Sequence, residues 1–379
     1  NTRRTNLWNQ TYAMDWGSVF FNVAALIAGV FLLDYGADKF LDHTVIVGQR
    51  LGISPTLIAL LTAGAEYEEL AVVIAAILQG RTPLALGNVM GSTISNILGA
   101  FSLGILCYSD GRPFDSSAKI YSALQFFVTT VFVILAHFQQ LNRVTGGLLI
   151  ALFALYIISI SYAIYRGISE PPQLSDSESD DESTDVCAEQ TSGRSAGPSA
   201  SEASPLLGDT NTTREMASAS VNKDKSLLRP LYYHVVQLIF GLLALSLSGY
   251  ILARSAGSIA DSLHLSGTVF GLTVIAFATT LPEKLVAMLS GFRGQGGIIV
   301  ATTAGSNIFL LTLCVGIVAV AGRPLDQSDT FILFDLVTVW VSSASLLAVV
   351  FLGPHRIAGL VLLTAYVVFL VMEFTVYRR

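Results

Sequence analysis

About ten stretches of mostly apolar residues, each long enough to cross a lipid bilayer, run through this chain of 379 residues. A spanning helix needs roughly 20 such residues, whereas barrel strands are shorter and alternate in polarity. Apolar residues make up 53% of the chain and charged residues 13%, which excludes an ordinary soluble domain. The predicted fold class is therefore an all-α polytopic membrane protein. Its helices are expected near residues 17–35, 54–79, 84–108, 119–138, 145–165, 231–254, 266–291, 297–321, 329–352 and 355–376.

A long polar segment divides these stretches into two groups of five. Residues 167–229 lack apolar periodicity and contain most of the acidic excess behind the net charge of −6, so we expect a disordered acidic and Ser-rich linker. The two membrane halves are then 1–166 and 230–379. Because each half has an odd number of spans, the second inserts upside down relative to the first, which predicts two inverted five-helix repeats. Nothing in this charge pattern indicates a nucleic-acid partner; the lipid bilayer is the expected surrounding.

The two halves share a pattern centred on one glutamate each. Glu69 and Glu283 are each followed 22 residues later by a Gly-Ser pair, Gly91-Ser92 in the first half and Gly305-Ser306 in the second. A carboxylate near the bilayer centre costs several kcal/mol and marks a functional site by default. Two such carboxylates in repeated segments predict a cation site at the repeat interface.

The first half has three carboxylates within four residues. Glu66 and Glu69 are three apart and share a helix face, while Glu68 projects away from it. At mid-membrane depth the three cannot all stay ionised without cations or protons beside them. The alternative is that Glu66 and Glu68 cap or flank a helix near the membrane interface.

Oxygen ligands for a divalent cation occur around these carboxylates. Calcium takes six to eight oxygens, and Glu69 and Glu283 would balance its charge. A helix break at Gly64 would expose backbone carbonyls, which is tolerated at this depth only where they line a cavity. Ser92 and Asn96, four apart on the third predicted helix, offer a hydroxyl and an amide oxygen to a small cation.

In the second half, the sequence AFATTLPEKL places Thr279 and Thr280 just before Pro282. Proline kinks a helix and frees a carbonyl oxygen, so these residues can supply ligands. The alternative for the threonine hydroxyls is a hydrogen bond to their own helix. Three roles remain open for Lys284: its side chain snorkels, pairs with Glu68, or substitutes for a counter-cation.

These two segments resemble the α-1 and α-2 repeats of the cation/calcium antiporter superfamily, the sodium/calcium exchangers. The family pattern is roughly Gly-Thr-Ser-x-Pro-Glu, then Gly-Asn-x-x-Gly-Ser-Asn-x-x-Asn or Asp. The first repeat, about 54–108, reads GAEYEE and GNVMGSTISN; the second, about 266–321, reads ATTLPE and ATTAGSNIF followed by Leu310. The wording GAEYEELAVV is similar to that of a fungal branch of sodium/calcium exchanger-like proteins.

The resemblance implies roles for eight residues. Calcium would be bound by the carboxylates of Glu69 and Glu283 and by the carbonyls of Ala65 and Thr279. Flanking monovalent-ion sites would be lined by Ser92, Asn96, Thr280 and Ser306.

The chain also departs from the family pattern in ways that bear on the counter-ion. Ala65 and Glu66 stand where the family has Thr and Ser, Glu68 replaces the first repeat's proline, and Leu310 replaces a ligating Asp or Asn. The loss of that ligand puts the standard sodium stoichiometry in doubt. The protonatable Glu66 makes proton coupling a serious alternative.

The predicted function is a secondary active antiporter that exchanges calcium for sodium and/or protons by alternating access. The alternatives are a proton-coupled exchanger of divalent cations such as calcium or manganese, a cation channel, and an intramembrane hydrolase. A hydrolase would want Asp in Tyr-Asp and Gly-x-Gly-Asp contexts, which the sequence lacks. No ATP-binding loop or catalytic dyad is present, so we expect no enzyme and no cofactor beyond the transported ions.

Short signals outside the predicted helices bear on location. Glu202 to Leu207 resembles an acidic dileucine sorting signal, and Ser175, Ser177 and Ser179 lie in an acidic run typical of kinase substrates. We therefore expect a vacuolar or other endomembrane location, with a sorting adaptor and a kinase acting on the linker. A chance match and a merely solvated tether are the alternatives. The sequon at Asn9 and a slight excess of basic residues in the short inner loops place the N-terminus in the lumen or outside the cell.

Overall fold

The computed structural model describes residues 16–51, 66–108, 113–165, 230–321 and 332–377. In these ranges every regular element is a helix, and eight helices are long and apolar enough to cross a membrane. A bent pair of helical segments forms a ninth span, and the remaining expected span, near 54–79, is described only from Glu66 onward. The predicted all-α polytopic membrane fold is confirmed. The linker 167–229 lies outside the described residues.

The two halves contain the same series of spans, interrupted at corresponding places. The first half consists of α2 (Trp16–Arg50), α4 (Tyr67–Leu78), α5 (Thr82–Ile94), η1 (Ser95–Phe101), α6 (Ser102–Cys107), α7 (Ser116–His137) and α8 (Arg143–Tyr165). The second consists of α10 (Leu231–Ser262), α11 (Gly267–Phe270), η2 (Gly271–Ile275), α12 (Ala276–Thr279), α13 (Leu281–Phe292), α14 (Gly296–Phe309), η3 (Leu310–Cys314), α15 (Val315–Ala321), α17 (Leu333–Leu352) and α18 (Arg356–Thr375). The elements named η are π-helical segments inside longer helices.

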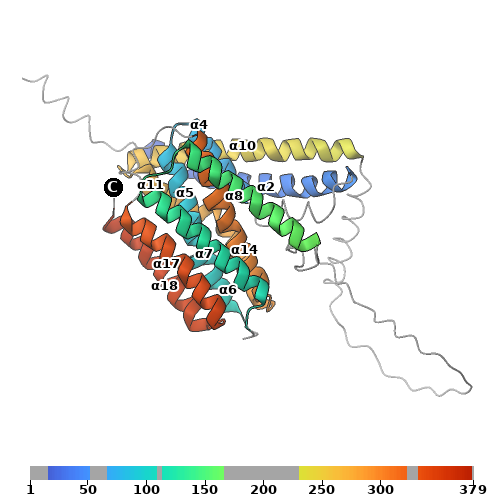
Figure 1. Ribbon diagram of the computed structural model, residues 1–379. Coiled ribbons are helices and arrows are strands. Elements are labelled where there is room, and N and C mark those ends of the chain that lie inside the picture. The colour runs from blue at the N-terminus through green and yellow to red at the C-terminus, as the bar shows by residue number, and fades with distance from the viewer. Residues whose placement is uncertain (1–15, 52–65, 109–112, 166–229, 322–331, 378–379) are drawn as a thin grey trace, which may run out of the picture.

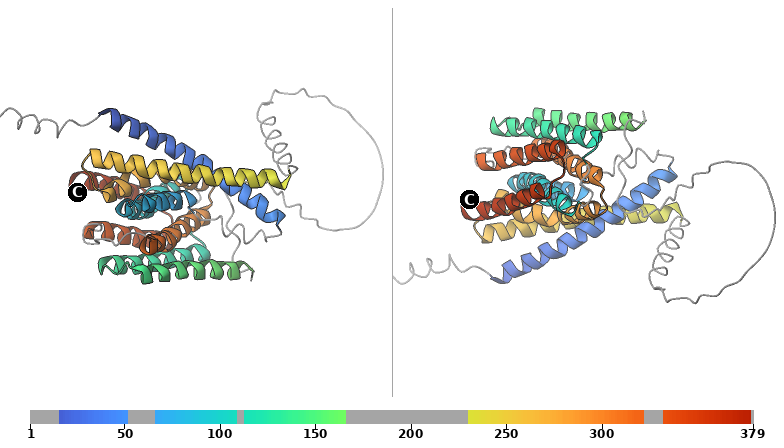
Figure 2. Two further views of the ribbon diagram at one scale, coloured as in Figure 1. Left: turned by 90° about the horizontal axis from the view of Figure 1, so that it is seen from above. Right: turned by 90° about the horizontal axis from the view of Figure 1, so that it is seen from below.

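The first spans of the two halves, α2 and α10, lie side by side and together form one outer layer of the bundle. Figure 1 shows α2 beside α10, and Figure 2 shows this pair on one face of the bundle, α7 and α8 on the opposite face, and α5 between them. The α5–η1–α6 span is accordingly almost wholly buried. The segments that carry the repeated pattern therefore meet in the middle of the bundle.

The α2 helix is longer than the sequence predicted. It continues to Arg50 instead of ending near residue 35, although Asp38 and Lys39 interrupt the apolar run. The extension packs along α10, where the side chain of His43 lies buried against that of His234 with 3.1 Å between their Nδ1 atoms. A prediction from hydropathy ends the span at the first charged residues. In the structure the helix continues past them, because it packs against a neighbouring helix.

Equivalent turns end the helices that carry the two glutamates. Gly80 follows α4 and Gly294 follows α13, with φ of 70° and 72°. These left-handed conformations favour glycine and allow the next residue to close the helix end: Arg81 donates its backbone N–H to the carbonyl of Ala76 at 2.8 Å. The repeat thus fixes the same helix–turn–helix geometry in each half.

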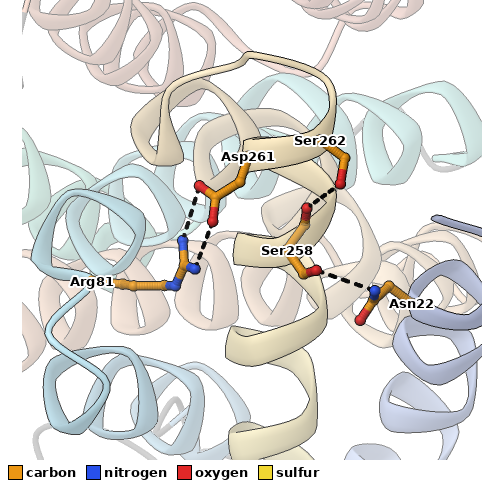
Figure 3. A network of polar contacts seen from close by, with 5 residues as sticks. All are labelled: Asn22, Arg81, Ser258, Asp261 and Ser262. Carbon is orange, nitrogen blue, oxygen red and sulfur yellow. Dashed lines mark hydrogen bonds and ion pairs between the residues drawn. The ribbon is translucent and has the colours of Figure 1, made fainter. Parts of the chain in front are cut away.

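A polar network joins the outer layer to the interior helices at one end of the bundle (Figure 3). Arg81, just before α5, donates two hydrogen bonds to Asp261 of α10 at 2.8 and 3.3 Å. Asn22 of α2 donates to the hydroxyl of Ser258 at 3.1 Å, and Ser262 donates to the Ser258 carbonyl at 2.8 Å. Because the Arg81–Asp261 pair is partly exposed, we assign it a positioning role and less than about 1 kcal/mol of stability.

The repeats cross with almost no space between their backbones. A Cβ added at Gly87 would lie 2.3 Å from the carbonyl oxygen of Thr268, and one at Gly91 would lie 2.2 Å from that of Leu272. Only glycine permits such an approach. The crossing places α5 and η1 directly against the broken span that carries Glu283.

Candidate functional site

Three glutamates from the two repeats come together at the centre of the bundle. Glu66 lies just before α4 and Glu69 in its first turn, while Glu283 lies in the first turn of α13. Glu66 and Glu69 are buried, and Glu69 is close enough to both other carboxylates to interact with them electrostatically. Helix N-termini favour negative charge, which explains why a broken span can place carboxylates here.

Glu66 occupies the N-cap position of α4, but its side chain makes no capping hydrogen bond. It turns instead into the interior, where its Oε1 accepts a hydrogen bond from Asn96 Nδ2 at 2.9 Å and the Ser306 hydroxyl lies beside the same carboxylate. The capping alternative for Glu66 is therefore wrong. Its carboxylate belongs to the same cluster as Glu69.

A cavity of about 190 Å³ opens onto this cluster. Its wall includes Glu66, Glu283, Asn96 and Ser306, and it extends to the C-terminal half of α2 at Leu41. The two repeats thus contribute polar groups to one space.

Many oxygen atoms of this cluster have no hydrogen-bond donor among the described residues. Five of them are buried: Glu66 Oε2, Glu69 Oε1, Glu69 Oε2, Asn96 Oδ1 and Glu283 Oε2. Ser92 Oγ of α5 is a further buried oxygen without a donor among these residues. Buried polar atoms are normally satisfied, so such a set needs an explanation. Carboxylate, amide and hydroxyl oxygens in this number match the ligand demand of calcium, and the residues fit such a cation as cargo.

Asn307 is a member of the site that the sequence analysis did not single out. It is fully buried, its Oδ1 accepts from Asn96 Nδ2 at 3.3 Å, and its own Nδ2 donates to the carbonyl of Thr93 at 3.4 Å. Asn307 thereby connects α14 to α5 and orients the amide of Asn96. Its place directly after the Gly-Ser pair was the signal that could have identified it.

The threonines before Pro282 use their hydroxyls within their own helix. Thr279 Oγ1 donates to the carbonyl of Ile275 at 3.1 Å, and Thr280 Oγ1 donates to that of Ala276 at 2.6 Å. The span bends by 48° between Thr279 and Leu281. Because Pro282 has no N–H, the carbonyl four residues earlier loses its usual donor.

Lys284 is the residue whose place the sequence left most open. Its ammonium donates to the hydroxyls of Ser95 and Thr280 and to the carbonyl of Thr280. Pairing with Glu68 is not what the structure shows, because within the described ranges no carboxylate lies within 4.0 Å of its Nζ. The lysine side chain is buried, with its ammonium between Ser95 and Thr280.

The structure shows the positions of Glu68 and Leu310, but it does not describe that of Ala65. Glu68 is half-buried on the cavity wall, where it interacts electrostatically with Asp34 and Asp38 of α2 and also with Glu66 of the cluster. Leu310 is fully buried at the start of η3. Ala65, together with the expected break at Gly64, lies outside the described residues.

The π-helical segments are the second feature that sequence reasoning missed. The η1 segment begins at Ser95, beside Asn96, and η3 begins at Leu310 in the corresponding place of the second repeat. Such segments are rare inside α-helices and occur frequently at functional sites. No residue pattern in the sequence indicates them.

The fold resembles that of two solved structures, one of which is a sodium-calcium exchanger. The structure of native YfkE matches with a TM-score of 0.60 at 16% identity, over 95% of this chain and 94% of that one. The sodium-calcium exchanger NCX_Mj matches with a TM-score of 0.51 at 20% identity, over 92% of this chain and 98% of that one. The similarity to these structures confirms the predicted fold with two inverted repeats.

Related sequences also cover nearly the whole chain. A putative antiporter of Alkalimonas amylolytica, CaxA, is 26% identical over 351 residues, which is 90% of this chain and 95% of the relative. The sodium/calcium exchanger MaX1 of Methanosarcina acetivorans is 24% identical over 93% of this chain and 98% of its own length. The sequence profile described as sodium/calcium exchanger protein matches residues 21–162 and 233–375. Since these two ranges include most of both membrane halves, the chain belongs to the sodium/calcium exchanger protein family.

Proposed function

We propose that this protein is a secondary active antiporter that exchanges calcium for sodium and/or protons across a membrane by alternating access. The observation that carries the proposal is the set of buried oxygens without donors, which both repeats supply around one cavity. Family membership and relatives of nearly full length support it.

Coupling would arise from competition for one set of carboxylates. Glu66, Glu69 and Glu283 interact electrostatically in a buried site, where uncompensated charge is costly. Calcium or a set of counter-ions neutralises them, but both cannot bind together. With either set of ions bound, the protein can close around the neutralised site. Without bound ions the three charges disfavour closure. This difference couples the calcium flux to the counter-ion flux.

In this proposal Glu69 and Glu283 are the calcium ligands that supply charge. The carbonyls of Thr279 and Ala65 are the expected neutral ligands; the bend after Thr279 is consistent with that role. Asn96 and Ser306 line the same cavity. Together with Ser92, whose buried Oγ has no donor among the described residues, they would complete the coordination of calcium or of a monovalent ion.

A specific observation favours protons as at least part of the counter-ion set. Leu310 offers no oxygen at the position where the family has Asp or Asn, while the added carboxylate of Glu66 lies buried in the cluster. Glu66 can neutralise itself by taking up a proton where another chain would bind a sodium ion. The second candidate function is therefore a proton-coupled exchanger of calcium or manganese.

Transport in vesicles tests the assignment of the ligands. Glu69→Gln and Glu283→Gln should abolish calcium uptake because each removes one negative charge without changing side-chain size. Asp261→Asn is the matched control, since it makes the same chemical change on the partly exposed α10 residue of Figure 3. Normal uptake by both glutamine variants would reject the proposal.

The counter-ion is tested by driving calcium uptake with either a sodium gradient or a pH gradient. Glu66→Ala should damage pH-driven uptake most if Glu66 carries the proton. Equal loss under both gradients would count against that role. Competition by manganese in the same assay tests the wider substrate range.

We also propose an endomembrane location, vacuolar in the first instance, with the N-terminus in the lumen or outside the cell. The support is the sequence from Glu202 to Leu207, the acidic serines of the linker and the sequon at Asn9, all outside the described residues. Deleting 202–207 from a fluorescently tagged chain should move it to the cell surface. The similarity of the GAEYEELAVV segment to fungal exchanger-like proteins stays a prediction.

A further inference from the structure

Lys284 is a buried lysine without a carboxylate partner in direct contact. It is 7% exposed, and within the parts of the chain that the structure describes no carboxylate lies within 4.0 Å of its Nζ. A buried charge is normally paired or fully hydrogen-bonded. Lys284 is of the second kind, and its hydrogen-bond partners are all neutral.

The ammonium is enclosed by three oxygen atoms and one aromatic ring. Nζ donates to Ser95 Oγ at 2.8 Å, to the carbonyl oxygen of Thr280 at 3.1 Å and to Thr280 Oγ1. The ring of Phe277 lies 4.9 Å from Nζ, within cation–π range. Three acceptors match the three protons of an ammonium group. We call these three oxygens the oxygen cage.

The surroundings hold this cage in place. Ser95 Oγ also contacts Thr280 Oγ1 at 2.8 Å and the hydroxyl of Tyr366 at 2.9 Å. A Cβ added at Gly99 would lie 3.1 Å from Cε of Lys284, so glycine leaves the width that the lysine stem needs. Residues from both repeats thus shape a slot for one cation.

The chemistry of the cage is that of a monovalent-cation site. Two hydroxyls and a carbonyl are hard, neutral oxygens of the kind that bind a small alkali-metal ion such as sodium. Thr280 is also one of the residues expected at a monovalent-ion site of the exchange cycle. A lysine ammonium is a compact group that carries a single positive charge, as that ion does.

The charges of the site agree with a permanent cation. Glu66, Glu69 and Glu283 together carry three negative charges when ionised, and all three interact electrostatically with Lys284. With the ammonium counted, two negative charges remain. One calcium ion balances them.

We propose that Lys284 is a tethered cation that permanently fills one monovalent-cation site of this antiporter. The inference rests on the proposed exchange function. Its consequence is that the protein exchanges each calcium for one fewer mobile monovalent ion than it would with the cage free. A purely structural lysine would affect stability but not this number.

The test compares Lys284→Ala, which frees the cage, with Lys284→Arg, which keeps the charge. Purified proteins in liposomes are loaded with calcium, and the reversal potential of calcium flux is measured at fixed ion gradients. Lys284→Ala should exchange one additional monovalent ion per calcium. Its reversal potential should therefore shift to the value expected for a transport cycle that moves one more monovalent charge. Lys284→Arg should keep the wild-type value, and an unchanged value in Lys284→Ala would overturn the proposal.

Binding of radioactive sodium to the detergent-purified proteins provides a readout that does not need transport. A monodisperse Lys284→Ala protein should bind one additional sodium ion, and adding Ser95→Ala should abolish that extra binding. Absence of extra sodium in the folded single variant would overturn the tethered-cation assignment. If wild-type protein moves no calcium under any gradient, the antiport proposal fails, while sodium binding still decides the role of Lys284.

Discussion

Replacing Gly91 with alanine tests whether the close crossing of α5 and η2 holds the site together. A Cβ there would lie 2.2 Å from the carbonyl oxygen of Leu272 and 2.6 Å from the Cβ of Ala276. The first of these atoms belongs to the backbone and has no rotamer to adopt, so the helices must move apart. To bring the added Cβ and this oxygen to ordinary van der Waals contact, the two helices must move apart by about 1 Å. Ser92 follows Gly91 directly and moves with it.

The expected loss of stability is the difference of two effects. Overpacking costs about 1–3 kcal/mol, and the upper end applies because the opposing atom is backbone. Alanine recovers about 1 kcal/mol over glycine in a helix interior. The net destabilisation of Gly91→Ala is therefore about 2 kcal/mol, which at roughly 2 °C per kcal/mol lowers the midpoint of thermal unfolding by about 4 °C.

Gly147→Ala is the matched control because Gly147 lies in α8 and an added Cβ there would meet no atom within 4 Å. It gains helix propensity without the clash, so its midpoint should stay unchanged or rise slightly. A thiol-reactive dye that reports exposure of the buried Cys314 follows unfolding of both variants in detergent. Calcium flux should fall only in Gly91→Ala. The reasoning is refuted if Gly91→Ala melts at or above the midpoint of Gly147→Ala.

Two further substitutions test hydrogen bonds inside the bundle. Asn96→Ala removes the donor to the carboxylate of Glu66 and one unpaired oxygen, so the apparent affinity for calcium in flux assays should fall about tenfold or more; an unchanged affinity would show that Asn96 is outside the ion path. Ser343→Ala leaves the buried Oε1 of Gln125 without its donor and should lower stability by about 1–3 kcal/mol. Among the residues that the structure describes, the buried Ser342 bonds only within its own helix, to the carbonyl of Val339. Ser342→Ala should therefore cost clearly less in the same unfolding assay, and equal losses would contradict the assignment.

Much of the site could be predicted because it contains residue types that are energetically costly to place in a membrane. Glu66, Glu69 and Glu283 stand out in apolar surroundings, and the repeated Gly-Ser pairs relate the two segments that carry the glutamates. The structure brings these three side chains together. The signal for Asn307, its place after the Gly-Ser pair, was weaker, because a buried amide after a small residue also suits ordinary helix packing.

Other features could not be predicted because they depend on which helix lies opposite. The α2 helix passes Asp38 and Lys39 since α10 packs along it, and hydropathy contains no term for that contact. The π-helical segments η1 and η3 lie in buried parts of their spans and follow no residue pattern in the sequence. Local sequence specifies neither.

By itself, the sequence determined a membrane-spanning helical chain with two related halves and a carboxylate in the middle of each. Long apolar runs and intramembrane charges have few physical solutions, so these conclusions follow from composition and spacing. Only the tertiary structure decided where the side chain of Lys284 lies. Snorkelling, pairing with Glu68 and replacing a cation were equally compatible with its place in the chain; the backbone crossing that sets Ser95 beside Thr280 placed three neutral oxygens around its ammonium.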